Sequence, residues 1–397
     1  MQDATATSRA GSLLAASRRS EVPPFMVMDV MAAAARIEAS GGHVIHMEVG
    51  QPAAPAPRTA RLAAHAALER GQIDYTSALG LPSLRTRIAR HYRDAYGCDV
   101  DPERIVVTTG SSGAFILAFL AMFEPGDRVA VTVPGYPPYR HILTALGCEP
   151  VLIETSSENR HALTGEALLA AHRRTPLKGV LVGSPANPTG TMMSRDALTQ
   201  LIAAADSEGI RFISDEIYHG LDYAFPAVTA AELSPRALVI NSFSKYFCMT
   251  GWRVGWMVVP EPLVRPIERL QQNLSISVPT LSQIAAEAAF DGRDEMDIIK
   301  DGYEENRRIL IAGLPQAGLD TFLPADGAFY LYADISKFAG NSLDFTRAML
   351  EQAYVAATSG IDFDPVNGHR FVRLSYARSS AEMHEAVVRI TRWLTAA

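Results

Sequence analysis

The sequence predicts an α/β fold, with a mostly parallel sheet that helices cover on both faces and with a second, smaller domain. Three observations support this prediction. Short apolar runs alternate with helical stretches from about residue 104 onwards. A long helical stretch then precedes further strand-like runs. The chain of 397 residues is also long enough for one large core and a smaller one.

The strands of the sheet are expected at short, continuous apolar runs. Such runs are typical of parallel strands that are buried on both faces, because a half-exposed strand would alternate apolar and polar residues. The runs are RIVVTT (104–109), RVAVTV (128–133), GVLVG (179–183), IRFIS (210–214), ALVIN (237–241) and VGWMVV (254–259).

The second domain is expected after a helix over 281–313 that contains one break. The strand-like runs AFYLYADI and FVRLSYA follow this helix. Residues 1–20 are rich in Ala, Ser and Thr, which favours a flexible segment. The expected division is a flexible N-terminal segment, 1–20; an N-terminal part of the small domain, 21–49; a large domain, 50–290; and a linker helix with the C-terminal small domain, 291–397.

Composition argues against several classes of function. The net charge of -7, the pI near 5.8 and the lack of a basic run argue against nucleic-acid binding. The longest apolar stretch, Ala114 to Phe123, is too short to cross a membrane, and no signal peptide is evident, so a cytoplasmic protein is expected. Three scattered cysteines and ten histidines form no C-x-x-C or H-E-x-x-H motif, so neither a disulfide framework nor a metal site is expected.

Polar residues follow the expected strands directly, where open α/β sheets bind ligands. Gly110-Ser111-Ser112-Gly113 lies between a strand and an apolar helix. Backbone N–H groups and hydroxyls in such a turn can bind a phosphate, although Ser112 could equally be a simple helix cap. No Walker motif, G-x-G-x-x-G or G-x-S-x-G is present.

Two further strand ends carry candidate ligand contacts. Asn187 lies in SPANPTG, where its side chain could donate to a ligand oxygen or simply form an Asn-Pro turn. Asp215 follows IRFIS, and a carboxylate at a buried strand end is costly without a positive partner. Asp215 is therefore either a ligand to a cationic group or the cap of the next helix.

Lys245, in SFSK, follows another buried strand, where an ammonium group is costly unless it has a partner or a lowered pKa. A buried lysine has a lowered pKa, which would make it a candidate nucleophile towards aldehydes, whereas a surface lysine that extends into water is the ordinary alternative. Arg253, in GWRVGW, could bind a phosphate through two hydrogen bonds or pair with a carboxylate.

One small molecule, pyridoxal 5′-phosphate, would satisfy all of these groups together. It has an aldehyde, a protonated ring nitrogen, a phenolic oxygen and a phosphate. The expected partners are Lys245 for the aldehyde, Asp215 for the ring nitrogen, Asn187 and Tyr218 for the phenolic oxygen, and Ser111, Ser112, Ser242 and Arg253 for the phosphate.

The chain resembles the class I/II, fold type I pyridoxal-phosphate aminotransferases. The resemblance runs from PPF (23–25) and EVGQP (48–52) to FVRLSYA (371–377). SPANPTG, SDEIY and SFSK followed by GWRVGW occur in the order and spacing of that family. The resemblance implies a large domain with a mostly parallel seven-stranded sheet, a smaller α+β domain, and a homodimer.

The resemblance also implies roles for individual residues. Lys245 would form the internal aldimine and carry the proton between Cα and C4′, while Asp215 would hold the pyridinium proton. Asn187 and Tyr218 would contact the ring oxygen O3′, and Ser111, Ser112, Ser242 and Arg253 would hold the phosphate. Tyr136 would stack on the ring, and Tyr75 would reach the phosphate of the neighbouring subunit. Arg373 would bind the substrate α-carboxylate, close to Gly50 and Asn187.

The expected activity is ping-pong transamination between an L-amino acid and a 2-oxo acid. A C–S β-lyase of the same fold is an alternative, because the cofactor contacts are shared and only the surroundings of the substrate differ. A non-catalytic regulator that binds the cofactor is a further alternative. The apolar segment Val22 to Met28 is expected to cover the site and to favour neutral or aromatic amino acids.

Overall fold

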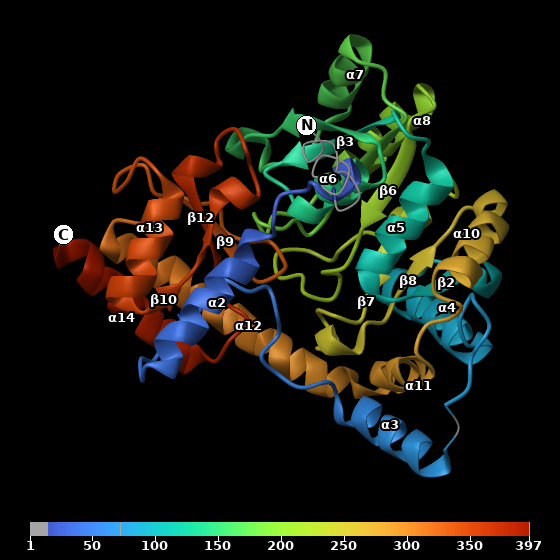
Figure 1. The fold of residues 1–397 in the computed structure, drawn as a ribbon, viewed down its shortest axis with the longest axis horizontal. Helices are drawn as coiled ribbons and strands as arrows, with labels where there is room; N and C mark the ends of the chain where they lie inside the picture. The colour runs from blue at the N-terminus through green and yellow to red at the C-terminus, as the bar shows by residue number, and fades with distance from the viewer. Residues whose placement is uncertain (1–14, 72, 397) are drawn as a thin grey trace, which may run out of the picture.

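A seven-stranded sheet stands at the centre of the computed structural model, which describes residues 15–71 and 73–396 (Figure 1). Its strands are β2 (Ile105–Thr108), β3 (Arg128–Val133), β4 (Glu149–Glu154), β5 (Gly179–Gly183), β6 (Arg211–Asp215), β7 (Leu238–Ser242) and β8 (Gly255–Val258). They lie in the order β2-β8-β7-β6-β5-β3-β4. Only β8 is antiparallel to its neighbours, so the predicted mostly parallel sheet is confirmed.

The sheet is buried because helices cover both of its faces (Figure 1). Ile213, Ile240 and Met257 pack in one apolar cluster, whereas Phe212 and Val239 pack in another. Neighbouring residues of a strand point to opposite faces, so each strand except the edge strand β4 contributes to both clusters. The helices are α2 (Met26–Ala39), α3 (Arg58–Arg70), α4 (Pro82–Tyr96), α5 (Gly110–Met122), α6 (Pro137–Ala145), α7 (Gly165–Arg174), α8 (Arg195–Ser207), α9 (Ala230–Leu233), α10 (Glu261–Leu274), α11 (Thr280–Ala289), α12 (Arg293–Gly313), α13 (Ser342–Ala348) and α14 (Ser380–Ala396).

The edge strand β4 was not among the apolar runs predicted from the sequence. It begins and ends with a glutamate and contains Pro150, and much of it is only partly buried. Pro150 is tolerated because an edge strand leaves some of its N–H groups unpaired. Edge strands often carry polar residues, so a search for continuous apolar runs does not find this strand.

A smaller antiparallel sheet packs beside the large one. Its strands, in spatial order, are β11 (Thr358–Ser359), β12 (Phe371–Ser375) and β9 (Tyr330–Asp334). A separate parallel pair joins β1 (Ile45–His46) to β10 (Val355–Ala356). Figure 1 shows α2, in blue, against these orange and red C-terminal elements. The N-terminal segment thus packs with the C-terminal part of the chain, while the domain boundaries given above stay predictions.

The long helix predicted over 281–313 is confirmed, together with its break. The break is a 3-10 turn, Phe290–Gly292, that separates α11 from α12. Figure 1 shows α12 running from below the large sheet towards the small one. One long element therefore connects the two sheets.

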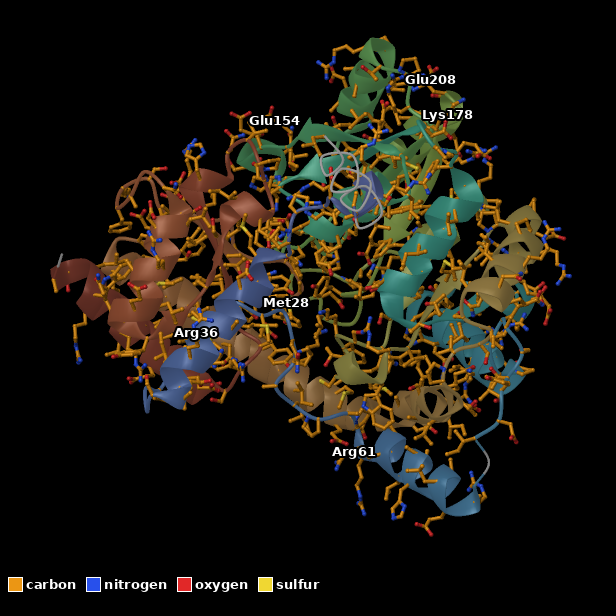
Figure 2. The ribbon with its side chains drawn as sticks, viewed as in Figure 1. Met28, Arg36, Arg61, Glu154, Lys178 and Glu208 are labelled. Carbon is orange, nitrogen blue, oxygen red and sulfur yellow. The ribbon has the colours of Figure 1, made fainter. Side chains whose placement is uncertain are left out.

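The surface of the molecule carries most of the charged side chains. Figure 2 shows Glu154, Lys178 and Glu208 in the upper part of the molecule, near its outline. The predicted flexible segment, 1–20, lies largely outside the described residues; within the part that is described, Arg18–Ser20 form a 3-10 turn. Among the helices of the described residues, none is long and apolar enough to cross a bilayer.

Candidate active site

The predicted site residues meet at a cavity of about 230 Å³, where the parallel strands of the large sheet end. Segments that follow β2, β6 and β7 line it, together with the small-sheet residues Tyr330 and Arg373. All predicted site residues except Tyr75 and Ser242 line this cavity. They are Gly50, Ser111, Ser112, Tyr136, Asn187, Asp215, Tyr218, Lys245, Arg253 and Arg373.

Lys245 lies in the turn that follows β7 and is largely enclosed by protein. Its Nζ donates to the carbonyl oxygen of Gly50 at 2.6 Å and lies 5.7 Å from the ring centre of Tyr218. Burial, followed by the nearby charge of Arg373, lowers the pKa of Lys245 to about 8, although Asp215 acts in the opposite direction. A substantial fraction of this amine is therefore neutral near that pH and can act as a nucleophile or base.

Asp215 ends β6 and is almost fully buried, with 4% of its surface exposed. One carboxylate oxygen accepts from the backbone N–H of Ile217 at 3.1 Å, and the other accepts from the Tyr139 hydroxyl. Burial raises the pKa of Asp215 to about 6, and these hydrogen bonds oppose that rise. Residues 217–220 form a turn, so the alternative that Asp215 caps a helix does not apply.

The electrostatics of Asp215 suit a positively charged ring nitrogen. Among the described residues, no lysine, arginine or histidine forms an ion pair with its carboxylate, since the nearby Lys245 bonds to Gly50 instead. A buried carboxylate without a cation is costly, and a protonated ring in the cavity would offset that cost. This is the first respect in which the residues fit pyridoxal phosphate.

A second region of the cavity suits a phosphate. Ser111 and Ser112 lie in the first turn of α5, and neither hydroxyl bonds another described residue. The N-cap of α5 is Thr109 rather than Ser112. Arg253 lies alongside, and a Cβ on Gly110 would stand only 2.5 Å from its Nη2. Free N–H groups at a helix start, two hydroxyls and a guanidinium together form an anion site.

Arg253 reaches this region because β8 runs against the other strands. The first residues of an antiparallel strand stand at the same edge as the last residues of its parallel neighbours. Arg253 precedes β8 and has a left-handed backbone, with φ of 50°. Its Nη1 donates to the carbonyl of Thr250 at 2.9 Å, which fixes the guanidinium beside Gly110.

Arg373, on β12, is a buried arginine that faces the cavity with only 1% of its surface exposed. Its Nη1 donates to Asn187 Oδ1 at 3.0 Å, and its Nη2 donates to the carbonyl of Glu48. The rings of Tyr330 and Phe363 lie 4.5 and 4.7 Å from the guanidinium carbon. Its buried Nε has no partner among the described residues, and no described carboxylate pairs with it. An incoming carboxylate would complete this site.

Two of the predicted residues lie elsewhere. The buried Ser242 hydroxyl bonds Ser244 at 2.9 Å and the Val254 carbonyl at 3.2 Å, and it does not line the cavity. Ser244, just past the end of β7, lines it instead. Tyr75 is 81% exposed and does not line the cavity of its own chain.

Sequence reasoning missed two tyrosines of the site. Tyr139 donates to Asp215, and the Tyr330 hydroxyl bonds that of Tyr218 at 2.8 Å. Tyr330 also explains the glycine at position 50, because a Cβ there would stand 1.8 Å from its hydroxyl oxygen. Tyr139 lies three residues after Tyr136, which is the N-cap of α6, and this nearness in sequence is the only local signal for Tyr139.

The segment expected to cover the site does so. Phe25, Val27 and Met28, at the start of α2, line the cavity, and the ring of Phe25 stands edge-on to Tyr136 at 6.0 Å. Figure 2 shows Met28 near the middle of the view. Within the described chain, no group of three or more His, Cys, Asp or Glu side chains could hold a metal ion.

Comparison with known proteins gives matches over nearly the whole chain. A family described as aminotransferase class I and II matches residues 42–390. The valine–pyruvate aminotransferase of Mycobacterium tuberculosis is 48% identical over 95% of this chain and 97% of its own length. The aspartate aminotransferase of Geobacillus stearothermophilus is 31% identical over 96% and 99%.

Solved structures agree with these matches. A crystal structure of an aminotransferase from Mycobacterium tuberculosis superposes with a TM-score of 0.94 at 46% identity, covering 96% of this chain and 100% of that one. The aspartate aminotransferase of Thermus thermophilus with maleate gives 0.89 at 30% identity, covering 95% and 99%. The predicted fold type I architecture is therefore confirmed.

The lowered pKa of Lys245 can be measured directly. The sequence contains only four lysines, the others being Lys178, Lys300 and Lys337. We expect reductive methylation of Lys245 in the cofactor-free protein to show a midpoint near pH 8, as quantified by mass spectrometry of the digest. The exposed Lys178 in the same digest is the internal control. Identical pH profiles for the two lysines would contradict the lowered pKa.

Tyr139→Phe should raise the pKa of Asp215 further, because it removes a hydrogen bond to the ionised carboxyl. The folded-state pKa of about 6 lies above the ordinary 3.8, so ionisation of Asp215 opposes folding increasingly as the pH rises between those values. The substitution should therefore lower the free energy of unfolding by about 1 kcal/mol more at about pH 8 than at about pH 5.

This difference can be measured by urea unfolding of the cofactor-free protein. Tyr136→Phe is the matched control, because Tyr136 lines the same cavity without bonding Asp215. An equal loss of stability at both pH values would show that Tyr139 does not control the ionisation of Asp215.

Proposed function

The chain belongs to the class I and II aminotransferase family, and we propose that it uses pyridoxal 5′-phosphate to move the amino group of an apolar L-amino acid to a 2-oxo acid. The observation that carries the proposal is the set of buried charged groups around one cavity, each lacking a counter-charge that the cofactor or substrate would supply. The aminotransferase names of the relatives favour transamination over the β-lyase alternative.

Particular residues would hold the cofactor. We assign its aldehyde to Lys245, its ring nitrogen to Asp215, one ring face to Tyr136, and its phenolic oxygen to Asn187 and Tyr218. The phosphate would lie on Ser111, Ser112 and Arg253, with Ser244 in place of Ser242 because Ser244 lines the cavity. When bound, the cofactor supplies an electron sink that stabilises negative charge at the substrate Cα.

The protein itself would move the proton and hold the charges. The neutral amine of Lys245 would take the Cα proton as general base and return it to the other end of the reacting system. Its pKa of about 8 suits both directions of transfer near neutral pH. The Asp215 carboxylate would keep the ring nitrogen protonated, and Tyr139 would keep that carboxylate ionised.

The substrate α-carboxylate is assigned to Arg373, with Asn187 and the backbone of Gly50 beside it. The planar fork of an arginine matches a carboxylate with two hydrogen bonds. The bond from Arg373 to Asn187 and the two flanking aromatic rings hold this fork in one orientation. A fixed fork would orient the Cα–H bond towards Lys245.

The side chain of the substrate would meet an apolar wall of Phe25, Val27, Met28 and Ile217. The cations that line the cavity, in the described part of this chain, are Lys245, Arg253 and Arg373, and each already has an assigned partner. A second carboxylate on the substrate would therefore remain without a counter-charge. The valine–pyruvate relative supports valine or a similar amino acid as donor, with pyruvate as acceptor.

A homodimer in which Tyr75 contacts the phosphate of the neighbouring site is also proposed. Tyr75 is the most exposed large apolar side chain among those described, and Ile73, Leu274 and Ile276 are exposed as well. The segment that carries Tyr75 bonds the start of α11 through Asp74 and Thr280. A fixed, exposed cluster of apolar side chains is typical of a surface that another chain covers.

Lys245→Ala should abolish the visible absorbance that develops when pyridoxal phosphate is added, and should lower turnover by at least about 10³-fold. The expected loss follows because no other lysine lines the cavity in the described residues. Absorbance spectra and a coupled assay for the 2-oxo acid provide the measurement, with Lys300→Ala as control. Release of ammonia from the wild type without a 2-oxo acid acceptor would favour the β-lyase alternative.

The apolar wall predicts a preference among donors. We expect kcat/KM for valine to exceed that for aspartate by at least about tenfold, because the aspartate side chain would lose water without gaining a counter-charge. Met28→Arg should raise kcat/KM for aspartate, whereas Met28→Gln, of similar size and without charge, should not. A wild type that prefers aspartate would refute the assignment of the wall.

A further inference from the structure

Two consecutive residues after β4, Arg160 and His161, have left-handed backbones, with φ of 52° and 54°. This conformation is unfavourable for residues with a Cβ, and it persists only where the surroundings hold it. At Arg160, the hydrogen bonds of the guanidinium group hold the backbone in this conformation. Its Nη2 donates to both oxygens of Asp326, at 2.7 and 2.8 Å, and to the carbonyl of Pro324 at 3.2 Å.

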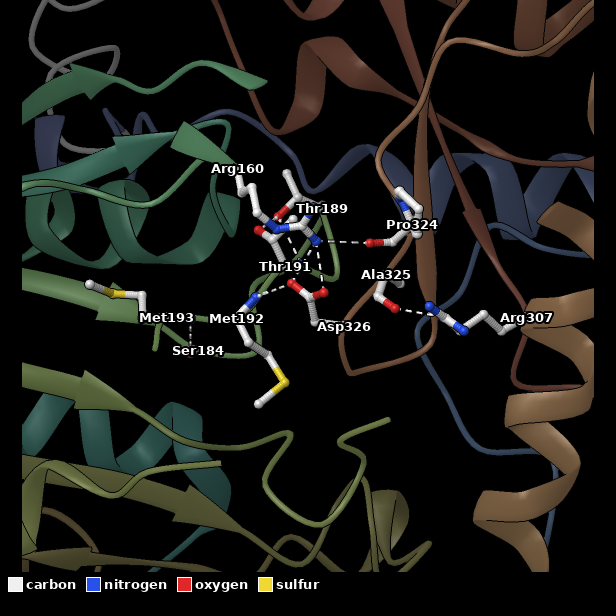
Figure 3. A network of polar contacts seen from close by, with 10 residues as sticks. All are labelled: Arg160, Ser184, Thr189, Thr191, Met192, Met193, Arg307, Pro324, Ala325 and Asp326. Carbon is white, nitrogen blue, oxygen red and sulfur yellow. Dashed lines mark hydrogen bonds and ion pairs between the residues drawn. The ribbon is translucent and has the colours of Figure 1, made fainter. Parts of the chain in front are cut away.

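The ion pair joins distant parts of the chain. Arg160 follows an edge strand of the large sheet, whereas Asp326 lies 166 residues later, in the loop that leads into β9 of the small sheet. Figure 3 shows the two side chains meeting between the large sheet and the C-terminal elements. Exposed fractions of 43% for the Arg160 side chain and 10% for that of Asp326 indicate a pair that is partly removed from water. Such a pair interacts more strongly than one at the surface.

Asp326 also holds a third segment, the turn after Asn187. Its Oδ2 accepts from the N–H of Met192 at 3.0 Å (Figure 3). The backbone N–H of Asp326 donates to the Gly190 carbonyl at 2.8 Å. Gly190 has φ of 68°, and a Cβ there would stand 2.6 Å from the Cβ of Ala325. The turn 186–192 and the loop 324–327 are therefore in close contact, with the carboxylate between them.

Each of these segments carries a residue of the cavity. The turn carries Asn187, which accepts from Arg373 at 3.0 Å. The loop leads directly into Tyr330, which bonds Tyr218 and flanks Arg373. We propose that Arg160 and Asp326 form a latch between the two segments. This latch fixes Asn187 and Tyr330 relative to Arg373, so Arg160 and Asp326 are positioning residues for carboxylate binding. This inference rests on the proposed role of Arg373.

A second ion pair provides a matched control. Arg370 and Asp334 also meet at 2.7 Å, with exposed fractions of 50% and 11%, close to those of the latch. Asp334 stands at the end of β9 opposite Tyr330, and Arg370 directly precedes β12. Among the described residues, the side chains of this pair form no hydrogen bond or ion pair with the turn 186–192.

The test compares Asp326→Asn with Asp334→Asn. The amide keeps the size of the side chain and an acceptor for Met192, but it removes the charge that holds Arg160. We expect KM for the amino acid and KM for the 2-oxo acid each to rise about tenfold while kcat changes by less than about threefold, because both substrates carry the α-carboxylate. Asp334→Asn should leave both KM values unchanged. Arg160→Ala should reproduce Asp326→Asn, and the double variant should add little to either.

A second measurement needs neither substrate nor cofactor. Hydrogen exchange of the peptide 186–193 should be faster in Asp326→Asn and Arg160→Ala than in the wild type or Asp334→Asn. Without the ion pair, the side chain that accepts from the Met192 amide is no longer fixed in place. Unchanged exchange would overturn the latch, and faster exchange with unchanged KM values would overturn its positioning role. Failure of the proposed function is distinguishable, because it would appear as a wild type that does not transaminate or as transamination that persists in Lys245→Ala, whereas the exchange measurement depends on neither.

Discussion

The cavity depends on charges that the chain removes from water without pairing them with one another. Lys245, Asp215 and Arg373 all face it, and the described residues supply no ion pair for any of the three. Such groups oppose folding, so the surrounding structure has to be stable enough to hold them. The buried strands of the large sheet provide that stability, because both of their faces pack against helices. The same constraint makes the site reactive, since burial shifts the pKa values of Lys245 and Asp215 towards neutrality.

The sequence was informative wherever a functional residue follows a continuous apolar strand. Asp215 stands directly after such a run, and Lys245 and Asn187 lie in the turns that follow theirs, so their placement at one edge of the sheet followed from strand direction. The placement of Arg253 at the same edge could not be predicted from local pattern, because it depends on β8 being antiparallel. The family resemblance supplied Arg373, because no local pattern brings β12 to the large sheet.

The residues that sequence reasoning missed or misplaced have a common cause. Tyr139 and Tyr330 bond partners 76 and 112 residues away, so their roles appear only in the folded chain. Ser242 was predicted to contact the phosphate, but β7 ends at Ser242 and its hydroxyl bonds the Val254 carbonyl and Ser244 instead. The latch between Arg160 and Asp326 likewise joins two loops that carry no recognisable motif. Contacts between distant segments thus set the details that a motif cannot specify.

The pairing of β1 with β10 has a consequence for biosynthesis. Ile45 leaves the ribosome well before its partner Val355 has been made. The strands of the large sheet are all synthesised between these two points, so that sheet can begin to form first. The N-terminal segment, including the apolar start of α2 that lines the cavity, has to wait for the C-terminal part before it can dock. Premature termination before Val355 would therefore leave the apolar helix α2 exposed, and chaperones and proteases recognise such a species.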